Sequence, residues 1–99
     1  MAHDVFISHS TKDKIVASAV CAALETDNIR CWVAPRDIRP GLTWAEAIAG
    51  AIEKSKVMVL IFSSDSNNSK EVLKEMTLAL DSGVIVIPFR IELIEPKGP

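Results

Sequence analysis

Four short apolar runs alternate with three amphipathic segments along the chain, and this alternation predicts the fold. The apolar runs cover residues 3–8, 29–33, 57–62 and 84–89. Residues 57–62 are wholly apolar, which is typical of a strand that is covered on both faces of a parallel sheet. Because parallel neighbours need helical crossovers, the order strand, helix, strand, helix, strand, helix, strand predicts an α/β domain with a doubly wound parallel sheet.

Each amphipathic segment carries an apolar stripe at helical spacing and polar or flexible residues that mark its ends. The expected caps are Ser10 with Asp13, Thr43 with Glu46 as a capping box, Ser69 or Asn68, and Gly83 at the end of the third helix. The three stripes predict buried side chains at Val16, Ala19, Val20, Ala23 and Leu24, at Trp44, Ala47, Ile48, Ala51 and Ile52, and at Val72, Met76, Ala79 and Leu80.

Three segments read as irregular. Residues 34–42 form a long exposed loop that Pro35, Pro40 and Gly41 punctuate, and residues 63–69 form a polar loop without glycine. Residues 94–99 read as a turn or linker, because they contain two prolines and a glycine.

The handedness of crossovers turns this element order into a topology. With the flavodoxin-like strand order second, first, third, fourth, the first helix covers one face of the sheet, and the second and third helices cover the other. The third and fourth strands then expose a contiguous apolar face on the side of the first helix. We expect that either the chain continues with another strand and helix in its natural form, or a partner covers this face.

Composition limits the class of protein. The 99 residues form at most one domain, 1–99, and 48% hydrophobic residues with a net charge of -2 indicate a globular core. No apolar run approaches the roughly 18 residues of a membrane span, and no basic and apolar leader precedes the first strand. We therefore expect a cytoplasmic protein that does not bind a membrane.

Metal and nucleic acid are both improbable ligands on this composition. Cys21 and Cys31 fall within a helical and a strand pattern, so we interpret them as reduced, buried residues, and their spacing does not supply a zinc site. The basic residues are scattered and offset by acids, so they do not build a face that selects phosphate backbones.

The carboxyl ends of the first and third strands meet at the topological switch point, where α/β sheets bind ligands. This brings residues 8–10 against residues 63–66, with Glu75 on the helix that follows. Glu75 lies beside the apolar stripe, so we interpret it as a boundary carboxylate that can bind sugar hydroxyls or stabilise an oxocarbenium ion. Glu71 lies further toward solvent, and its place near the helix start is explained by the macrodipole.

Several other chemistries are disfavoured at this edge. The loop after the first strand reads SHSTKD and contains neither GxGxxG nor GxxxxGK, so it fits neither a Rossmann nor a P-loop nucleotide site. Ser8 and His9 are adjacent on a strand and point to opposite faces, which argues against a serine–histidine catalytic pair. His9 is better interpreted as a surface or ligand-lining residue.

The residues at this edge and around it carry a family resemblance. The segments HDVFISHSTKD, APRDIRPGLTWAEAI, KVMVLIFSSDSNNS, EVLKEMTLAL and GVIVIPFRIE, in this order and spacing, resemble a bacterial Toll/interleukin-1 receptor (TIR) domain. The resemblance covers nearly the whole chain and implies the strand order 2-1-3-4. It also implies that the usual fifth strand and last helix are absent, so that the chain is truncated at its C-terminal side.

The resemblance further implies an activity and its residues. Bacterial TIR domains typically cleave NAD at the nicotinamide glycosidic bond on self-association, with hydrolysis or cyclisation, as defence or signalling effectors; NAD is then a substrate and no cofactor is needed. Glu75 matches the catalytic glutamate. The matching substrate-binding positions are Phe6, Ser8, Ser10, Arg36, Asp37, Trp44 and Ser64. The BB loop, which mediates assembly with other TIR domains, matches Pro35, Arg36, Asp37, Ile38, Arg39, Pro40 and Gly41.

One position departs from the family pattern and keeps a second function open. Many catalytic members carry a tryptophan four residues before the glutamate, where this chain has Glu71. The alternative is a noncatalytic TIR–TIR interaction or adaptor module that binds through residues 34–42. A receiver domain is a more distant alternative, because the first strand ends in Ser8 and His9 rather than in an acidic pair.

Overall fold

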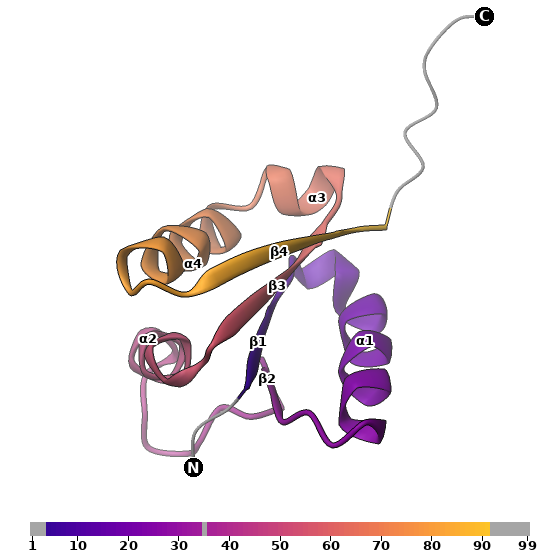
Figure 1. Cartoon of the computed structure of the whole chain (residues 1–99). Coiled ribbons are helices and arrows are strands. Elements are labelled where there is room, and N and C mark those ends of the chain that lie inside the picture. The colour runs from indigo at the N-terminus through magenta and orange to yellow at the C-terminus, as the bar shows by residue number, and fades with distance from the viewer. Residues whose placement is uncertain (1–3, 35, 92–99) are drawn as a thin grey trace, which may run out of the picture.

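The computed structural model describes residues 4–34 and 36–91, and within them it confirms the predicted α/β fold (Figure 1). The strands are β1 (Val5–Ser8), β2 (Cys31–Val33), β3 (Val57–Phe62) and β4 (Ile85–Arg90). The helices are the 3-10 helix η1 (Thr11–Asp13), α1 (Lys14–Thr26), α2 (Trp44–Lys54), α3 (Ser64–Asn67) and α4 (Lys70–Asp81).

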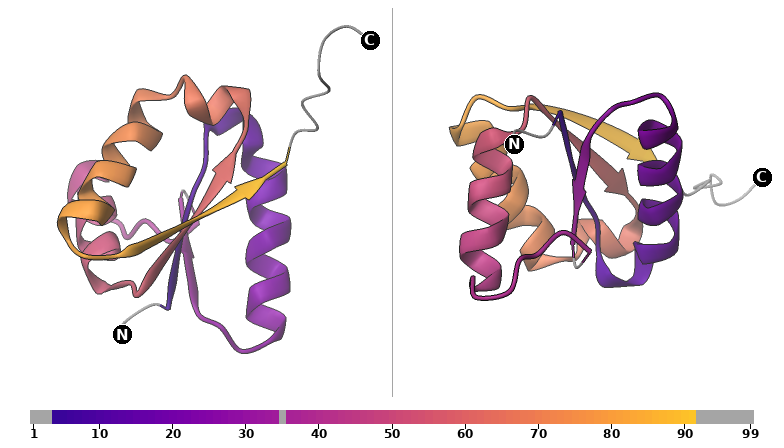
Figure 2. Two further views of the ribbon diagram at one scale, coloured as in Figure 1. Left: turned by 45° about the horizontal axis from the view of Figure 1, so that its top comes forward. Right: turned by 90° about the horizontal axis from the view of Figure 1, so that it is seen from below.

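The four strands form one parallel sheet in the order β2-β1-β3-β4, as predicted. Val5 is in register with Cys31 on one side and Val57 on the other, and Val57 is in register with Ile85. Figure 2 shows that α1 covers one face of the sheet, whereas α2 and α4 cover the other. This three-layer arrangement follows from right-handed crossovers on both sides of the switch point.

Each face of the sheet has its own core. On the α1 side, Ala17 and Cys21 pack with inward residues of β1 and β2, of which Ile7 is 1% exposed. On the other side, Ile52 of α2 and Ala79 of α4 pack with Met58 and with the stacked rings of Phe6 and Trp32. Alternate residues of one strand therefore enter opposite cores, as the pleat requires.

Two of the predicted helix signals are present in atomic detail. The Thr43 hydroxyl accepts a hydrogen bond from the Glu46 backbone N–H at 3.1 Å, and the Glu46 carboxylate accepts one from the Thr43 N–H. At the end of α4, Gly83 has φ +74°, and the N–H groups of Gly83 and Val84 bond to the carbonyls of Leu80 and Ala79. This is a Schellman motif, and its left-handed position explains the glycine.

Two local predictions about helix starts are wrong. The polar loop 63–69 contains the short helix α3, which Ser63 caps by accepting from the Ser66 N–H at 3.0 Å. Ser10 does not cap a backbone N–H; its hydroxyl donates to the Asp13 carboxylate, and a 3-10 turn precedes α1. A carboxylate that is itself buried competes well for a hydroxyl donor.

Four residues of the predicted stripes are exposed rather than buried: Ala19 and Ala23 of α1, Trp44, which is 59% exposed, and Leu80, which is 62% exposed. In α1 the buried residues are Ala17 and Cys21 instead, so the buried face of this helix is turned relative to the predicted stripe. Trp44 is the first residue of α2, at the carboxyl edge of the sheet, so its ring extends past the core. Leu80 follows the buried Ala79, and one residue turns the helix by about 100°, which takes Leu80 out of a narrow stripe.

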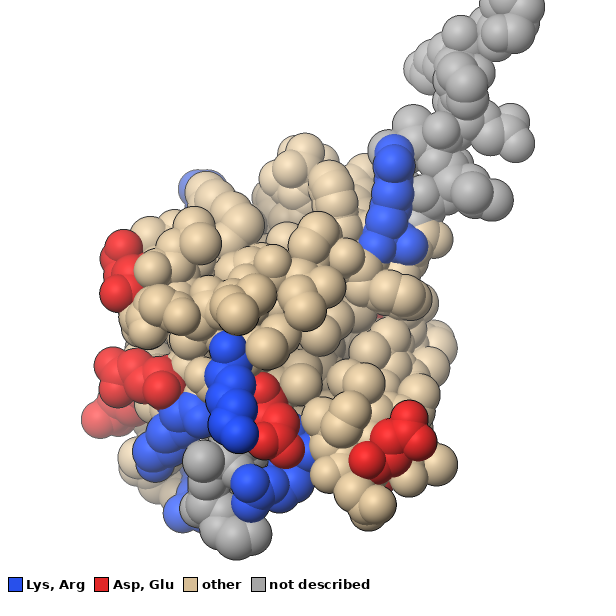
Figure 3. Space-filling view, in the orientation of Figure 1, with Lys and Arg blue, Asp and Glu red and all other residues tan. Residues whose placement is uncertain are grey.

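The α1 side of β4 is uncovered, as the topology predicted. Ile85, Ile87 and Phe89 share this face and are 63%, 49% and 47% exposed. Uncharged side chains occupy most of the middle of this side of the molecule (Figure 3). Pro35 and the predicted linker 94–99 lie outside the described residues, and a continuation into a fifth strand stays a prediction.

Candidate active site

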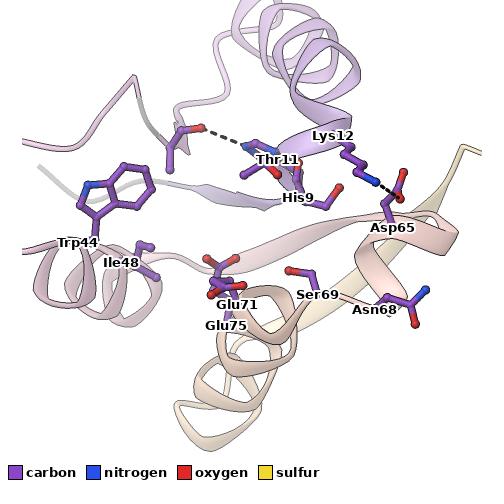
Figure 4. Close-up of a pocket in the computed structure, with 12 residues that line it drawn as sticks. His9, Thr11, Lys12, Trp44, Ile48, Asp65, Asn68, Ser69, Glu71 and Glu75 are labelled. Carbon is purple, nitrogen blue, oxygen red and sulfur yellow. Dashed lines mark hydrogen bonds and ion pairs between the residues drawn. The ribbon is translucent and has the colours of Figure 1, made fainter.

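A cavity of about 340 Å³ lies at the carboxyl edge of the sheet, where the topology predicts a ligand site (Figure 4). Segments that follow β1, β2 and β3 meet there with the first turns of α2 and α4. Its lining residues are His9, Ser10, Thr11, Lys12, Ala34, Trp44, Ile48, Asp65, Asn68, Ser69, Glu71 and Glu75.

Glu75 is held at the inner side of this cavity. It lies in the second turn of α4, and its Oε1 accepts a hydrogen bond of 2.6 Å from the hydroxyl of Ser8, which is 1% exposed. Burial raises the pKa of Glu75 above its usual value, while the Ser8 hydroxyl and the charge of His9 lower it. The sequence prediction of a boundary carboxylate is confirmed. Glu75 is oriented, partly desolvated and open to a ligand.

A second carboxylate, that of Asp13, joins elements that contribute residues to the cavity. The Asp13 Oδ2 accepts hydrogen bonds from the hydroxyls of Ser10 at 2.9 Å and Ser63 at 2.5 Å, and all three residues are buried. This cluster ties the loop after β1 to the start of α3. On the surface above it, the Lys12 Nζ lies 3.7 Å from an Asp65 carboxylate oxygen. Both contacts hold η1 and α3 together, and each of these elements contributes cavity residues.

His9 joins two loops at the rim. Its ring nitrogens lie 2.7 Å from the Ser10 carbonyl and 3.0 Å from the Ala34 carbonyl. The ring thus ties the loop after β1 to the loop after β2, and it also lines the cavity. The interpretation of His9 as a ligand-lining residue fits this position, and neither nitrogen bonds to the Ser8 hydroxyl, which is donated to Glu75.

Only part of the predicted substrate-binding set reaches the cavity. Glu75, Ser10 and Trp44 line it, and Ser8 lies directly behind Glu75. Phe6 does not line it: the ring is 1% exposed and stacks on Trp32 with centroids 5.1 Å apart, because its position on β1 faces the core. Ser64 is the first residue of α3 and is exposed outside the cavity.

Arg36 and Asp37 also lie outside the cavity, since both make contacts within the protein. The Arg36 guanidinium donates to both Glu25 carboxylate oxygens at 2.9 and 3.0 Å and to the Cys31 carbonyl at 3.1 Å. Asp37 accepts from Arg36 and from the Val33 N–H at 3.0 Å. The bond from Arg36 is the main cause that lowers the pKa of Glu25. These bonds fasten the start of the 34–42 loop to α1 and β2.

The rest of this loop divides into a buried and an exposed part. Ile38 packs against the core beneath α2, whereas Arg39, Pro40 and Gly41 are exposed. Pro35 is outside the described residues. Of the predicted interface set, the structure therefore presents mainly the segment 39–41 to solvent.

Glu71 is a charged cavity residue that the sequence analysis did not place in the site. It was expected to face solvent at the helix start, and it is exposed, but it lies on the cavity wall one turn before Glu75 (Figure 4). The spacing of four residues was the available signal, because positions i and i+4 share one face of a helix. Ala34, Ile48 and Asn68 had no comparable signal in the sequence.

The described residues give no indication of a metal centre or a membrane segment. Within 4–34 and 36–91, no group of three or more histidine, cysteine or acidic side chains could hold a metal ion. In the same part of the chain, no helix has both the length and the apolar character needed to cross a membrane.

The parallel sheet, its order and the cavity at its carboxyl edge define an α/β domain of the flavodoxin-like class. The sequence model of the TIR domain family matches residues 5–99, and the chain belongs to this family. The prediction of a TIR domain is therefore confirmed, whereas a bacterial origin stays a prediction.

Similar proteins come from plants and animals. A protein of Brachypodium distachyon named "Probable 2' cyclic ADP-D-ribose synthase BdTIR" is 31% identical over 88 residues, which are 87% of this chain and 39% of that protein. This chain thus spans well under half of the length of that relative.

Solved structures show the same fold. The TIR domain of the Toll-related receptor TRR-2 of Hydra magnipapillata superposes with a TM-score of 0.80 at 28% identity, over 98% of this chain and 74% of that one. A metazoan TIR-STING receptor from C. gigas superposes with a TM-score of 0.76 at 26% identity, over 92% of this chain and 31% of that one. The TIR domains of the activated Roq1 resistosome, which directly recognizes the pathogen effector XopQ, superpose with a TM-score of 0.79 over 90% of this chain and 57% of that one. The sequence identity is 23%, so this match shows the fold alone.

Proposed function

We propose that this TIR domain cleaves NAD at the bond between nicotinamide and ribose when copies of it associate, with Glu75 as the catalytic carboxylate. The observation that carries this proposal is the pair formed by Ser8 and Glu75: a buried hydroxyl fixes a partly desolvated carboxylate at the wall of the cavity. The plant relative, whose name is that of a probable 2' cyclic ADP-D-ribose synthase, supports a substrate of this class.

The chemistry of the bond suits a carboxylate of this kind. In NAD the nicotinamide ring is a cation, and when the C–N bond breaks the electron pair leaves with the ring, which becomes neutral. Positive charge then develops on the ribose as an oxocarbenium ion. A fixed carboxylate stabilises this charge and binds the ribose hydroxyls. Burial raises the pKa of Glu75, whereas the hydrogen bond from Ser8 orients the carboxylate and lowers its pKa.

Two fates of the sugar complete the reaction. Water adds to the anomeric carbon and loses a proton, which gives ADP-ribose, or a hydroxyl of the ADP-ribose moiety adds in its place, which gives a cyclic product. Both outcomes balance without a metal or redox partner. Analysis of the products by chromatography and mass spectrometry distinguishes the two.

The activity is tested by nicotinamide release. The chain is concentrated, or tethered at high density on vesicles, and incubated with NAD beside Glu75→Gln and beside Glu53→Gln, an exposed α2 acid outside this cavity. We expect release by the unchanged chain and by Glu53→Gln, and a loss of at least about 100-fold in Glu75→Gln. Equal release by all three proteins would exclude Glu75 as the catalyst.

Assembly through the 34–42 loop is part of the proposal. Arg36 and Asp37 are poor probes of this interface because their side chains hold the loop in place. Arg39 is exposed and forms no ion pair among the described side chains, so Arg39→Glu reports on contacts between copies. We expect Arg39→Glu to weaken self-association in analytical ultracentrifugation and to lower NAD cleavage at high protein density. Unchanged sedimentation would remove this loop segment from the interface.

A noncatalytic adaptor is the second candidate, and the identity of residue 71 favours it. Many catalytic relatives carry tryptophan at the position of Glu71, and Glu71 lies on the cavity wall. An adaptor would assemble through the loop and leave NAD intact. A form of the chain that is shown to be assembled and releases no nicotinamide would support this reading against catalysis.

A further inference from the structure

Two carboxylates lie side by side in the cavity. Glu71 and Glu75 are one turn apart on α4, and both line the same wall (Figure 4). The negative charge of Glu71 is one of the causes that raise the pKa of Glu75, which indicates that the two groups lie close together.

The cations of the cavity form no ion pair with these two carboxylates among the described residues, although the charge of His9 acts on Glu75. Lys12 is across the cavity, where its Nζ lies 3.7 Å from Asp65. The ring nitrogens of His9 face the carbonyls of Ser10 and Ala34. Among residues 4–34 and 36–91, no ion pair within 4.0 Å includes Glu71 or Glu75. This wall therefore presents negative charge to whatever enters.

An aromatic surface lines the same cavity as the two carboxylates (Figure 4). The indole of Trp44 is 59% exposed, and with Ile48 it forms the α2 side of the cavity. The face of an indole attracts cations through its quadrupole, and it also stacks on planar rings. An aromatic face in one cavity with two carboxylates fits a ligand that is both planar and positively charged.

We propose that Glu71 is a specificity-determining residue that makes the cavity prefer a positively charged aromatic ring, such as oxidised nicotinamide, over the same ring without charge. This inference rests on the proposed function, whose substrate carries such a ring. Glu71 acts on binding of the ring, whereas Glu75 acts on the sugar. Because the ring becomes neutral when its bond breaks, the same preference favours release of nicotinamide as product.

The test uses two ring probes that lack a glycosidic bond, so that catalysis does not enter. 1-Methylnicotinamide is a cation and nicotinamide is neutral, and NMR shift titration at low salt gives the ratio of their dissociation constants. We expect the unchanged chain to bind the cation more tightly than the neutral ring. In Glu71→Gln this preference for the cation should be about three- to fivefold smaller. Glu53→Gln should have the same preference for the cation as the unchanged chain, and high salt should reduce this preference in the unchanged chain.

Loss of the neighbouring charge in Glu71→Gln also favours ionisation of Glu75, which would increase the preference for the cation. A decrease is therefore specific to Glu71. An unchanged ratio in Glu71→Gln, with a native far-ultraviolet spectrum, would overturn the inference. Glu71→Lys provides a second variant, for which we expect the neutral ring to bind at least as well as the cation.

The two proposals fail separately. If the chain shows the ring preference and its loss in Glu71→Gln but never releases nicotinamide, the cation site stands and the catalytic proposal is wrong. If NAD is cleaved and Glu71→Gln has the ring ratio of the unchanged chain, catalysis stands and the inference is wrong. With active protein, Glu71→Gln should raise KM without lowering kcat, whereas Glu75→Gln should lower kcat.

Discussion

The Ser8 hydroxyl donates a 2.6 Å hydrogen bond to the Glu75 carboxylate, and this contact joins the end of the first strand to the last described helix. Ser8 is 1% exposed, so its hydroxyl has no access to solvent as an alternative partner. Burial raises the pKa of Glu75, and this hydrogen bond lowers it. The contact therefore fixes the position of the candidate catalytic group and opposes the effect of burial on its pKa.

Ser8→Ala tests this contact. Removing the donor leaves a partly buried carboxylate without its bond, so we expect the free energy of unfolding to fall by about 1–3 kcal/mol. The pKa of Glu75 should rise further, because the hydroxyl is what lowers it. Urea unfolding and carbon-13 NMR titration of the carboxyl group measure these effects. Ser18→Ala on the exposed side of α1 is the control, and equal effects of the two changes would contradict the assignment.

The raised pKa of Glu75 predicts how stability depends on pH. Above the usual pKa of glutamate, the unfolded chain is ionised while the folded chain still holds a proton, so stability falls as pH rises through the raised pKa. Glu75→Gln removes this loss. We expect the variant to melt at a higher temperature than the unchanged chain at neutral pH, and the gap to close near pH 4.

Glu46 predicts the opposite dependence of stability on pH. The bonds from Thr43 lower its pKa, so its contribution to stability is present above the usual pKa of glutamate and is lost as pH falls through the lowered value. Glu46→Gln should therefore melt at a lower temperature at neutral pH, with a gap that closes in acid. If Glu75→Gln and Glu46→Gln shift the melting temperature in the same direction at pH 7, one of the two assignments is wrong.

The buried Asp13 predicts a stability effect that surface acids lack. Asp13→Ala leaves the buried hydroxyls of Ser10 and Ser63 without their acceptor, and we expect a loss of about 2–4 kcal/mol. Asp13→Asn keeps an acceptor and should cost less. Asp27→Ala, an exposed residue at the end of α1, should stay within about 0.5 kcal/mol. Chemical denaturation ranks the three, and a negligible effect of Asp13→Ala would show that the cluster is not needed.

The two tryptophans give a direct readout of the cavity. Trp32 is 4% exposed and stacked on Phe6, whereas Trp44 is 59% exposed and lines the cavity. In Trp32→Phe the remaining emission should be red-shifted and quenched by iodide, and it should change when NAD binds. In Trp44→Phe the emission should be blue-shifted and insensitive to both. A response of Trp32 to NAD would place the ligand elsewhere.

The cysteines should be inert in the folded chain. Cys21 and Cys31 are 2% and 4% exposed, and burial raises the pKa of both thiols, that of Cys31 to about 12. Since the thiolate is the reactive form, we expect almost no reaction with Ellman's reagent at pH 8 until the chain unfolds, and two equivalents afterwards. Rapid modification of the native protein would contradict the packing of α1 on β2.

Strong periodic patterns made the architecture predictable. The apolar run 57–62, the capping box at Thr43 and the left-handed Gly83 each appear in the structure as expected. The errors lie where local signals compete. Ser10 can cap a helix or donate to Asp13, and only the tertiary burial of Asp13 decides between them. The serines of 63–69 are compatible with a loop or a helical turn, and the turn is fixed by reciprocal bonds between Ser63 and Ser66.

The site was predictable only in outline. Topology brings the ends of β1 and β3 together, and helical spacing places Glu75 at a boundary, so the location of the cavity follows from the sequence. Side-chain direction does not follow as readily. Phe6 turns into the core by the alternation of its strand, and Arg36 is occupied by Glu25, a residue eleven positions away that no motif indicated.

The cavity is assembled by contacts between distant parts of the chain, and this has a consequence for folding. Ser8 and Glu75 are separated by 67 positions, and Asp13 and Ser63 by 50. Closing such long loops costs entropy before any contact repays it, so these bonds form late, after β1 has paired with β3 and α4 has docked. During synthesis, a chain that has emerged only as far as β3 lacks α4 and therefore lacks Glu75. The proposed activity would thus be withheld until α4, the last described helix, is made.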